Sequence, residues 1–339
     1  RYKAAVIGLG QIGSAFDDDA KRTEIWTHSS AYSACPRTEL VAGADLDAGR
    51  RGAFLARRKT ARAHANWREM LRAEKPDIVS VCTPVATHHE IALGAAEAGV
   101  KAIFLEKPMC AEVGQAREVM EACERLGVVL AVNHSRRWDP VVTRARDLVA
   151  SGALGEPRSL VGWYSEKIYN MGTHLLDAMR LLGGELDWVS GAPFPGASAD
   201  EPTVAGFLGF ASGAKGFLAC QGRRESFVFE LDLLGSRGRL RLSDNCRKLE
   251  LSLFKESPNF SGYEELADAP LPPQADRPSG FLAAVGDLAD CLDGVRKAPS
   301  CTGRDGLLAL AAAESLRVSA AEGGRRIVLE EFVADRKPA

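Results

Sequence analysis

The sequence lacks the features that mark membrane, secreted and nucleic-acid-binding proteins. No apolar stretch approaches the roughly 18 residues of a membrane span. The first strand pattern begins at Tyr2, which predicts no signal peptide and a cytoplasmic location, although a start at Arg1 instead of Met leaves a trimmed leader open. With 43 Lys and Arg against 45 Asp and Glu, the net charge of −2 gives no basic footprint for nucleic acid or for a membrane surface.

Cysteine pairs are also missing. The eight cysteines form no C-x-x-C motif, and none lies at zinc-ligand spacing from the six histidines. Scattered cysteines of this kind are typical of a reduced protein, where they pack as small apolar residues. We therefore expect no bound metal.

The chain of 339 residues is long enough for about two domains, and its 46% hydrophobic and 26% charged residues are ordinary for a globular protein. Residues 1–134 alternate between short apolar runs and helix-length stretches, which predicts an α/β domain with a doubly wound parallel sheet. Ligands bind such sheets outside the carboxyl ends of the strands. The expected strands are Lys3–Ile7, Glu39–Ala44, Asp77–Cys82, Ala102–Leu105 and Val128–Val132, and the clearest helices are His88–Ala98 and Ala111–Leu126.

Residues 135–339 show a different rhythm, with strand-like runs joined by short turns. This pattern predicts a second α/β domain with a largely antiparallel sheet. The expected strands are Arg158–Tyr164, Thr203–Phe210, Gly216–Gln221, Phe227–Leu234, Gly238–Leu242, Glu250–Phe254 and Arg326–Leu329. The expected helices are Pro140–Ser151, Met171–Leu182, Gly280–Leu292 and Asp305–Ala321, and Pro258–Pro278 is expected to be a loop.

A glycine motif directly after the first strand predicts a dinucleotide site of the Rossmann type. Gly8, Gly10 and Gly13 would allow a tight turn, close approach of the pyrophosphate, and helix–strand packing, with Gln11 and Ile12 between them. The pyrophosphate would sit at the N-terminus of the following helix. Asp45 would bind the ribose hydroxyls and favour NAD, while Arg50 and Arg51 leave NADP as an alternative; a plain turn residue is the other interpretation of Asp45.

The spacing within this motif is unusual. About 30 residues separate Gly13 from Asp45, where roughly 20 are typical, and the excess is Phe16–Thr27 with its Asp17-Asp18-Asp19 run. Three acids beside a pyrophosphate would repel it, so they must point elsewhere. A solvated loop and a substrate-recognition loop both fit this segment.

Two further segments carry candidate chemistry. Lys107, in Glu106-Lys107-Pro108 at the end of the fourth strand, either faces the nicotinamide or forms a surface ion pair with Glu106. Asn170, His174 and Asp177 have i, i+4, i+7 spacing, so one helix face would present an imidazole beside a carboxylate. A histidine satisfied within the core is the alternative.

Together these motifs resemble the Gfo/Idh/MocA oxidoreductase family. The resemblance is carried by the glycine motif, Cys82-Thr83-Pro84 with His88, Glu106-Lys107-Pro108, the later histidine helix, and the Thr302-Gly303-Arg304-Asp305 entry to a long Ala-rich helix. It covers nearly the whole chain. It implies a Rossmann domain at 1–134 and a substrate-binding and oligomerisation domain at 135–339. It also implies NAD or NADP as cofactor and a homodimer or homotetramer built through the second sheet.

The resemblance also implies roles for individual residues. Lys107 matches the motif lysine and His174 the catalytic histidine. Asn170 stands where the family often has Asp, and the segment before it is short, so the usual substrate assignment does not carry over directly. The remaining expected cofactor-binding residues are Thr83, Pro84, His88, Glu106 and Asn133, and the remaining expected substrate-binding residues are Arg136, Trp138 and Tyr164, with Arg136 or Arg137 as a candidate anion ligand.

The predicted reaction is reversible hydride transfer between nicotinamide C4 and a secondary alcohol carbon of a sugar-like substrate. His174 would take the hydroxyl proton and Lys107 would hydrogen-bond the same oxygen. A nucleotide sugar or another biosynthetic sugar is the first substrate class expected, and an inositol or free aldose the second. An NAD-dependent glycosidase and a catalytically silent cofactor sensor are the two alternative functions.

Overall fold

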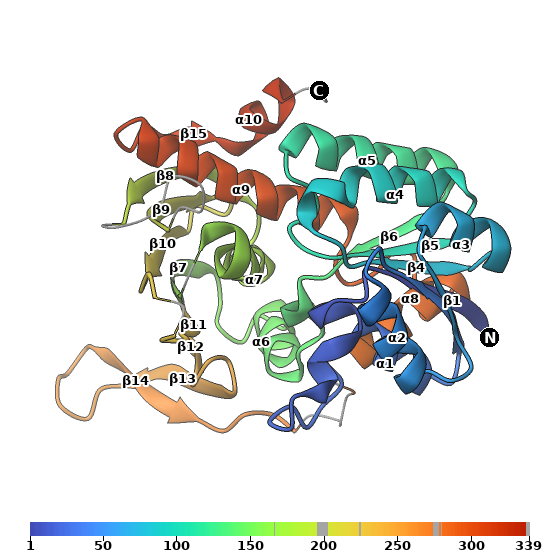
Figure 1. Ribbon diagram of the computed structural model, residues 1–339. Helices are drawn as coiled ribbons and strands as arrows, with labels where there is room; N and C mark the ends of the chain where they lie inside the picture. The colour runs from blue at the N-terminus through green and yellow to red at the C-terminus, as the bar shows by residue number, and fades with distance from the viewer. Residues whose placement is uncertain (166, 195–202, 224, 274–277, 279, 337–339) are drawn as a thin grey trace. The chain divides into compact units, whose positions relative to one another are not determined.

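The computed structural model describes residues 1–336 apart from 166, 195–202, 224, 274–277 and 279 (Figure 1). The chain divides into one unit of residues 1–138, 277–307 and 337–339, and another of residues 139–276 and 308–336. Residues 277–307 thus return to the first unit, whereas the sequence division placed them with the C-terminal part. None of the described helices is both long and apolar enough to cross a bilayer.

The first unit is a doubly wound α/β domain, as predicted. Its parallel six-stranded sheet has the order β3-β2-β1-β4-β5-β6, so the strand order reverses between β1 and β4. The three-residue strand β3 was not predicted because it is too short to show a period. The strands are β1 (Tyr2–Ile7), β2 (Thr38–Ala44), β3 (Arg62–His64), β4 (Ile78–Val81), β5 (Ala102–Leu105) and β6 (Val129–Val132).

Helices cover both faces of this sheet, which explains why the central strands read as continuous apolar runs. In Figure 1, α4 and α5 lie over one face, and α1, α2 and α8 over the other. All residues of β4 and β5 are buried. The helices are α1 (His28–Ala34), α2 (Ala48–Arg57), α3 (Trp67–Glu74), α4 (His88–Glu97), α5 (Val113–Leu126) and α8 (Gly280–Leu292).

The second unit contains a nine-stranded, mostly antiparallel sheet in the order β14-β13-β12-β11-β7-β10-β9-β8-β15. Among the described strands of this second sheet, only β7 and β10 pair in parallel. Two strands were not predicted: β8, and β14, which lies in the segment expected to be a loop. The strands are β7 (Pro157–Tyr164), β8 (Leu186–Pro193), β9 (Val204–Phe210), β10 (Lys215–Cys220), β11 (Phe229–Gly235), β12 (Gly238–Ser243), β13 (Lys248–Glu256), β14 (Glu264–Ala269) and β15 (Ile327–Val328).

Small residues let helices lie close against one face of this sheet. A Cβ at Gly162 would lie 2.8 Å from Leu175 Cδ2, and one at Gly191 would lie 2.1 Å from the Leu316 carbonyl oxygen. Leu175 belongs to α7 and Leu316 to α9, a long helix that begins in the first unit. The helices of this part are α6 (Pro140–Ala150), α7 (Thr173–Gly183), α9 (Gly303–Ala321) and α10 (Leu329–Asp335).

Candidate active site

The three glycines after β1 meet three different surroundings. Gly8 has φ +94°, and a Cβ there would lie 2.6 Å from the Cys82 carbonyl carbon at the end of β4. A Cβ at Gly13 would lie 2.0 Å from the Gly8 carbonyl oxygen. A Cβ at Gly10 would meet only Arg50 Nη1, at 3.9 Å. The first and third glycines are thus required by the protein itself, whereas Gly10 faces space that a pyrophosphate can fill, so the turn fits a dinucleotide.

The segment after these glycines corrects one expectation. Instead of a regular helix, Gln11–Ala15 forms a single wide turn and Phe16–Asp18 a 3₁₀ turn, and α1 begins only at His28. Ser14 and Ala15 donate their N–H groups to the Gly10 carbonyl. The N–H groups that precede Ser14 lie at the start of this turn. A bound pyrophosphate would therefore contact this short turn and not the N-terminus of a regular helix.

Asp45 connects the end of β2 to the glycine turn. Its Oδ2 accepts from the Leu9 N–H at 2.8 Å, and its Oδ1 from the Asp47 N–H at 2.9 Å. Arg50 lies 3.6 Å from the same carboxylate, while Arg51 donates to the Asp45 and Leu46 carbonyls. A carboxylate has about four acceptor sites. Asp45 therefore keeps acceptor capacity for a ribose hydroxyl, and Arg50 lies beside it at the turn.

The acidic run of the insertion points to partners in its own unit. Asp17 accepts from Thr27 Oγ1 at 2.5 Å and from the Trp26 N–H at 2.7 Å. Arg57 Nε donates to Asp18 at 2.8 Å, and Arg22 lies 3.5 Å from Asp19. The acids were expected either to point away from the pyrophosphate or to face another ligand group. Their contacts show that Asp17 and Asp18 attach the insertion to the start of α1 and to the end of α2, while the segment around Asp19 is exposed.

Glu106 is buried behind the E-K-P turn and holds several donors. Its Oε1 lies 2.9 Å from His28 Nε2 and accepts from Asn133 Nδ2 at 2.6 Å, and its Oε2 accepts from the Lys107 N–H at 3.2 Å. Burial acts to raise the pKa of Glu106. The hydrogen bonds from His28 and Asn133 and the charge of Lys107 outweigh it, so this pKa lies below its ordinary value. Glu106 is therefore ionised and supports the turn from behind, with Lys107 half-buried.

His88 joins the two loops that follow β4 and β5. Its Nδ1 lies 3.0 Å from the Pro108 carbonyl oxygen, and its Nε2 lies 2.8 Å from the Thr83 carbonyl oxygen. The ring itself is buried, with 1% of its surface exposed. Thr87 Oγ1 donates to Thr83 Oγ1 at 2.8 Å. His88 thus fixes the backbone of Thr83, Pro84 and the E-K-P turn at one edge of the sheet.

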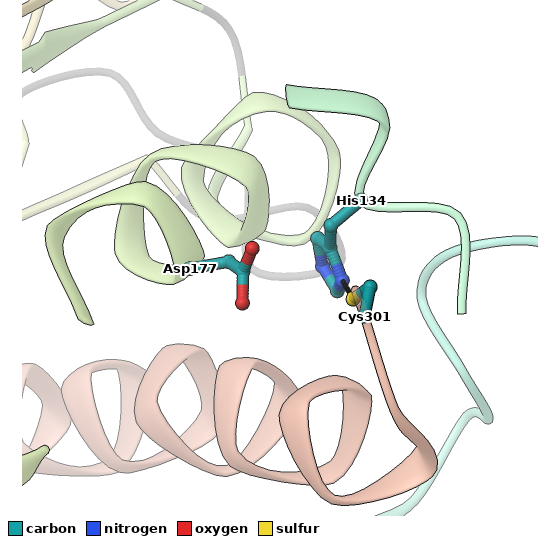
Figure 2. A group of neighbouring side chains, drawn as sticks. All are labelled: His134, Asp177 and Cys301. Atoms are coloured by element: carbon teal, nitrogen blue, oxygen red, sulfur yellow. Dashed lines mark hydrogen bonds between the residues drawn. The ribbon is translucent and has the colours of Figure 1, made fainter. Parts of the chain in front are cut away.

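The segment after β6 is largely internal to the first unit. Figure 2 shows the His134 ring beside Cys301, whose Sγ lies 3.8 Å from His134 Nδ1. Arg137 donates to Asp305 at 2.9 Å. Trp138 is 5% exposed, and its indole N–H donates to Asp287 at 2.9 Å. These contacts give Trp138 a structural role in place of the expected substrate contact, while Arg136 is half-buried in the same turn.

The histidine helix begins later than predicted. Asn170 lies in a wide turn, Ile168–Gly172, and α7 starts at Thr173. The regular i, i+4 register therefore does not extend back to Asn170, because a wide turn rotates less per residue. His174 and Asp177 do share a face of α7. Asp177 is fully buried and lies 3.6 Å from Arg180 Nη1.

Two tyrosines fix the elements around α7. Tyr164 is fully buried and donates to the Val204 carbonyl at 2.7 Å, which makes it a tie between β7 and β9 in place of the expected substrate ligand. Tyr169 donates to Glu314, which Arg317 also contacts at 2.6 Å. Burial and the neighbouring Glu314 raise the pKa of the Tyr169 hydroxyl.

Sequence reasoning missed His28 and Tyr169 because their partners are remote in the chain, 78 and 145 residues away. The signal for His28 was its place directly after the insertion, at the first position of α1. The signal for Tyr169 was its place next to Asn170. Neither position has a motif of its own.

Comparisons with known proteins agree with this geometry. A family model described as an oxidoreductase family with an NAD-binding Rossmann fold, GFO_IDH_MocA, matches residues 2–134. D-apiose dehydrogenase of Paraburkholderia graminis is 29% identical over 99% of this chain and 92% of its own length. Inositol 2-dehydrogenase of Rubrobacter xylanophilus is 35% identical over 48% of this chain and 44% of its own length.

Solved structures show the same fold over almost the whole chain. An oxidoreductase from Agrobacterium radiobacter in complex with NAD+, L-tartaric acid and magnesium superposes with a TM-score of 0.78 at 21% identity, covering 98% of this chain and 99% of that one. A levoglucosan dehydrogenase in complex with NADH and L-sorbose gives a TM-score of 0.79 at 18% identity, covering 98% and 100%. Residues 2–134 are therefore an NAD-binding Rossmann domain of the GFO_IDH_MocA oxidoreductase family, and the solved structures show the same fold for the rest of the chain.

Proposed function

We propose that this protein is a dehydrogenase that transfers a hydride between NAD and a secondary alcohol carbon of a sugar-like substrate. The observation that carries the proposal is that the glycine turn, Thr83 and Lys107 follow the neighbouring strands β1, β4 and β5, at one edge of one sheet. Open α/β sheets bind ligands at that edge. The names of the full-length and partial relatives support a polyhydroxylated substrate.

The cofactor would be held by the turn around Gly10 and by Asp45. Bound NAD supplies the hydride acceptor. Asp45 offers a carboxylate to the ribose hydroxyls and would repel a 2′-phosphate, which favours NAD, while Arg50 beside it leaves NADP usable. His88, Glu106 and Asn133 act from behind, by fixing the loops that carry Thr83, Pro84 and Lys107.

Lys107 and His174 would carry the proton chemistry. In the oxidising direction His174 takes the hydroxyl proton, and the Lys107 ammonium stabilises the negative charge that develops on the same oxygen. Asp177, buried one turn along α7, would hold the imidazolium that forms. Asn170 cannot accept a proton, so it would orient the substrate through its amide.

The substrate class we favour is a free sugar or an inositol. D-apiose dehydrogenase aligns over 99% of this chain, and its name and that of inositol 2-dehydrogenase both point to unactivated polyols. A nucleotide sugar, the first class expected from the sequence, needs a site for its diphosphate. Arg136 is the candidate for that contact, which makes nucleotide sugars a direct test of its role.

We further propose that the second unit self-associates through the exposed face of its sheet. Phe217 is 50% exposed and Trp163 is 38% exposed. Phe207 contacts Phe217 at 5.0 Å between ring centroids, and Trp188 at 5.2 Å. A monomer seldom leaves such an aromatic cluster in water. A homodimer or homotetramer would cover it.

The test is turnover by single-residue variants. NADH formation is followed at 340 nm with D-apiose, myo-inositol and UDP-glucose, using Lys107→Met and His174→Ala. Lys59→Met, at an exposed position, and His89→Ala, at a half-buried position whose ring contacts Glu118, are the controls. We expect the first two variants to lose at least about a hundredfold in kcat and the controls to keep it. Full activity in Lys107→Met or His174→Ala would refute the assignment. Tightly bound cofactor without net NADH would indicate the glycosidase, and binding without turnover the sensor.

A further inference from the structure

A buried chain of polar side chains leads from α1 to the E-K-P turn. His28, the first residue of α1, is fully buried. Its Nδ1 lies 2.8 Å from Ser80 Oγ on β4, and its Nε2 lies 2.9 Å from Glu106 Oε1 after β5. Tyr32 Oη lies 2.7 Å from the same Ser80 oxygen. His28 therefore links β4 to Glu106, the residue that follows β5 and precedes Lys107.

The partners decide which ring nitrogen carries the proton. Glu106 is ionised and can only accept, so His28 Nε2 must donate to it. With the proton on Nε2, the Nδ1 atom of a neutral ring accepts from the Ser80 hydroxyl, and Ser80 in turn accepts from Tyr32. Each hydroxyl then donates once, and the chain ends on the carboxylate without an unsatisfied group.

The surroundings leave His28 little freedom to turn. Its ring centroid lies 4.5 Å from that of Phe104 and 5.0 Å from that of Phe281. The insertion holds the backbone from the other side, because the Asp17 carboxylate accepts from Thr27 Oγ1, and Thr27 in turn caps α1. The extra residues before α1 thus help to place His28 through the contacts of Asp17 and Thr27.

The result is a fixed anion directly behind Lys107. Glu106 accepts from His28, Asn133 and the Lys107 N–H, so its carboxylate cannot rotate without losing buried hydrogen bonds. Among the described residues, the Cys82 thiol also faces Glu106. Burial and the charge of Glu106 raise the pKa of that thiol well above its ordinary value, so Cys82 stays neutral. Glu106 and the donors that keep it ionised therefore place one negative charge next to Lys107.

We propose that His28 is a positioning residue for Lys107: through its Nε2–H it holds Glu106 ionised and in place behind the turn. This inference rests on the proposed catalytic role of Lys107. Without the His28 donor, the buried carboxylate takes up a proton at higher pH, and Lys107 loses the backbone contact and the negative charge that Glu106 supplies.

The experiment compares three variants of the full chain. His28→Phe keeps the aromatic packing and removes both polar contacts. His28→Gln restores one donor and one acceptor. His64→Phe is the matched control, because His64 Nε2 makes a 2.9 Å contact with Glu74 in the same unit, beyond the contacts of the E-K-P turn.

Two measurements distinguish a positioning role of His28 from a purely structural one. The first is the pH profile of kcat and KM. The second, independent of turnover, is the pH dependence of Lys107 acetylation by acetic anhydride, read by peptide mass spectrometry on the cofactor-free protein. In His28→Phe we expect kcat to fall about tenfold, KM for NAD to change less than about twofold, and the acetylation profile to move to lower pH. His28→Gln should recover to within about threefold, and His64→Phe should change neither profile.

The inference is overturned if His28→Phe stays folded with wild-type profiles, if His28→Gln is as impaired as His28→Phe, or if His64→Phe shifts the two profiles as His28→Phe does. Should His28→Phe fail to fold, Ser80→Ala removes only the hydroxyl that selects the Nε2–H form. The same shift of the acetylation profile, smaller in size, is then expected, and its absence refutes the proposal. Full activity of Lys107→Met would refute the proposed function alone, because the acetylation readout still reports on His28.

Discussion

The glycine turn allows a test in which two similar substitutions should fail for different reasons. Gly10 has φ −71°, which alanine adopts freely, and its added Cβ would meet only Arg50 Nη1 at 3.9 Å. The Cβ of Gly13→Ala would lie 2.0 Å from the Gly8 carbonyl oxygen, which is backbone and cannot rotate away. Gly10→Ala should therefore spare the protein and obstruct the dinucleotide, whereas Gly13→Ala should strain the protein itself.

The magnitudes follow from these distances. Overpacking against backbone costs about 1–3 kcal/mol. At about 2–4 °C per kcal/mol for a domain of this size, Gly13→Ala should lower the Tm of the cofactor-free protein by roughly 2–12 °C. Gly10→Ala should leave that Tm unchanged or raise it slightly, because alanine restricts the unfolded chain by about 0.4–1 kcal/mol. Gly52→Ala is the control, since nothing lies within 4 Å of its added Cβ.

The assay is thermal unfolding with and without NAD, supported by calorimetric titration. At a concentration of 100 Kd, NAD should stabilise the wild type by about 2.7 kcal/mol. Gly10→Ala should lose at least about half of this increment through an affinity loss of at least about tenfold, whereas Gly52→Ala keeps it. A Gly10→Ala protein that binds NAD like the wild type would refute the claim that the open space beside Gly10 holds the pyrophosphate.

Three further changes have expected outcomes. The lowered pKa of Glu106 contributes stability that is complete above the ordinary glutamate pKa of about 4.5 and is lost as pH falls through the folded-state value, so Glu106→Gln should flatten the acid limb of a Tm–pH curve. Phe217→Glu should reduce the mass measured by light scattering, whereas a change at the exposed Lys59 in the first unit should not. Trp138→Phe, which leaves Asp287 without its indole donor, should cost about 1–3 kcal/mol in urea unfolding, and an unchanged midpoint would contradict the structural role of Trp138.

Periodicity revealed most of the fold because the strands of the first sheet are buried on both faces. Four-residue runs such as Ala102–Leu105 stand out between polar ends. β14 gave no such signal, because Glu264–Ala269 is an edge strand of mixed polarity. It is a strand because it pairs with β13, and its own residues do not show a strand pattern. The start of α7 was misplaced for a related reason, since a wide turn at Ile168–Gly172 and a helix have similar sequence patterns.

The residues of the candidate site likewise fall into those that the sequence could predict and those that it could not. Gly8, Gly13 and Glu106 could be found from motifs, because each is required by a contact a few residues or one strand away. The roles of Trp138 and Tyr164 could not, since only the structure shows that Asp287 and Val204 use their polar atoms. Motifs thus identify residues that a site cannot do without, but they do not separate ligand contacts from the contacts that hold those residues in place.

The insertion shows why this distinction matters for function. Its acidic run suggests a ligand or a solvated loop when it is considered as sequence, yet Asp17 and Asp18 are used to attach the segment to α1 and α2. This attachment helps to place His28, which contacts Ser80 on β4 and Glu106 after β5. An extra segment near the glycine turn is therefore connected to the E-K-P turn through the buried hydrogen bond between His28 and Glu106. Shortening Phe16–Thr27 should accordingly change the Lys107 acetylation profile more than it changes the affinity for NAD.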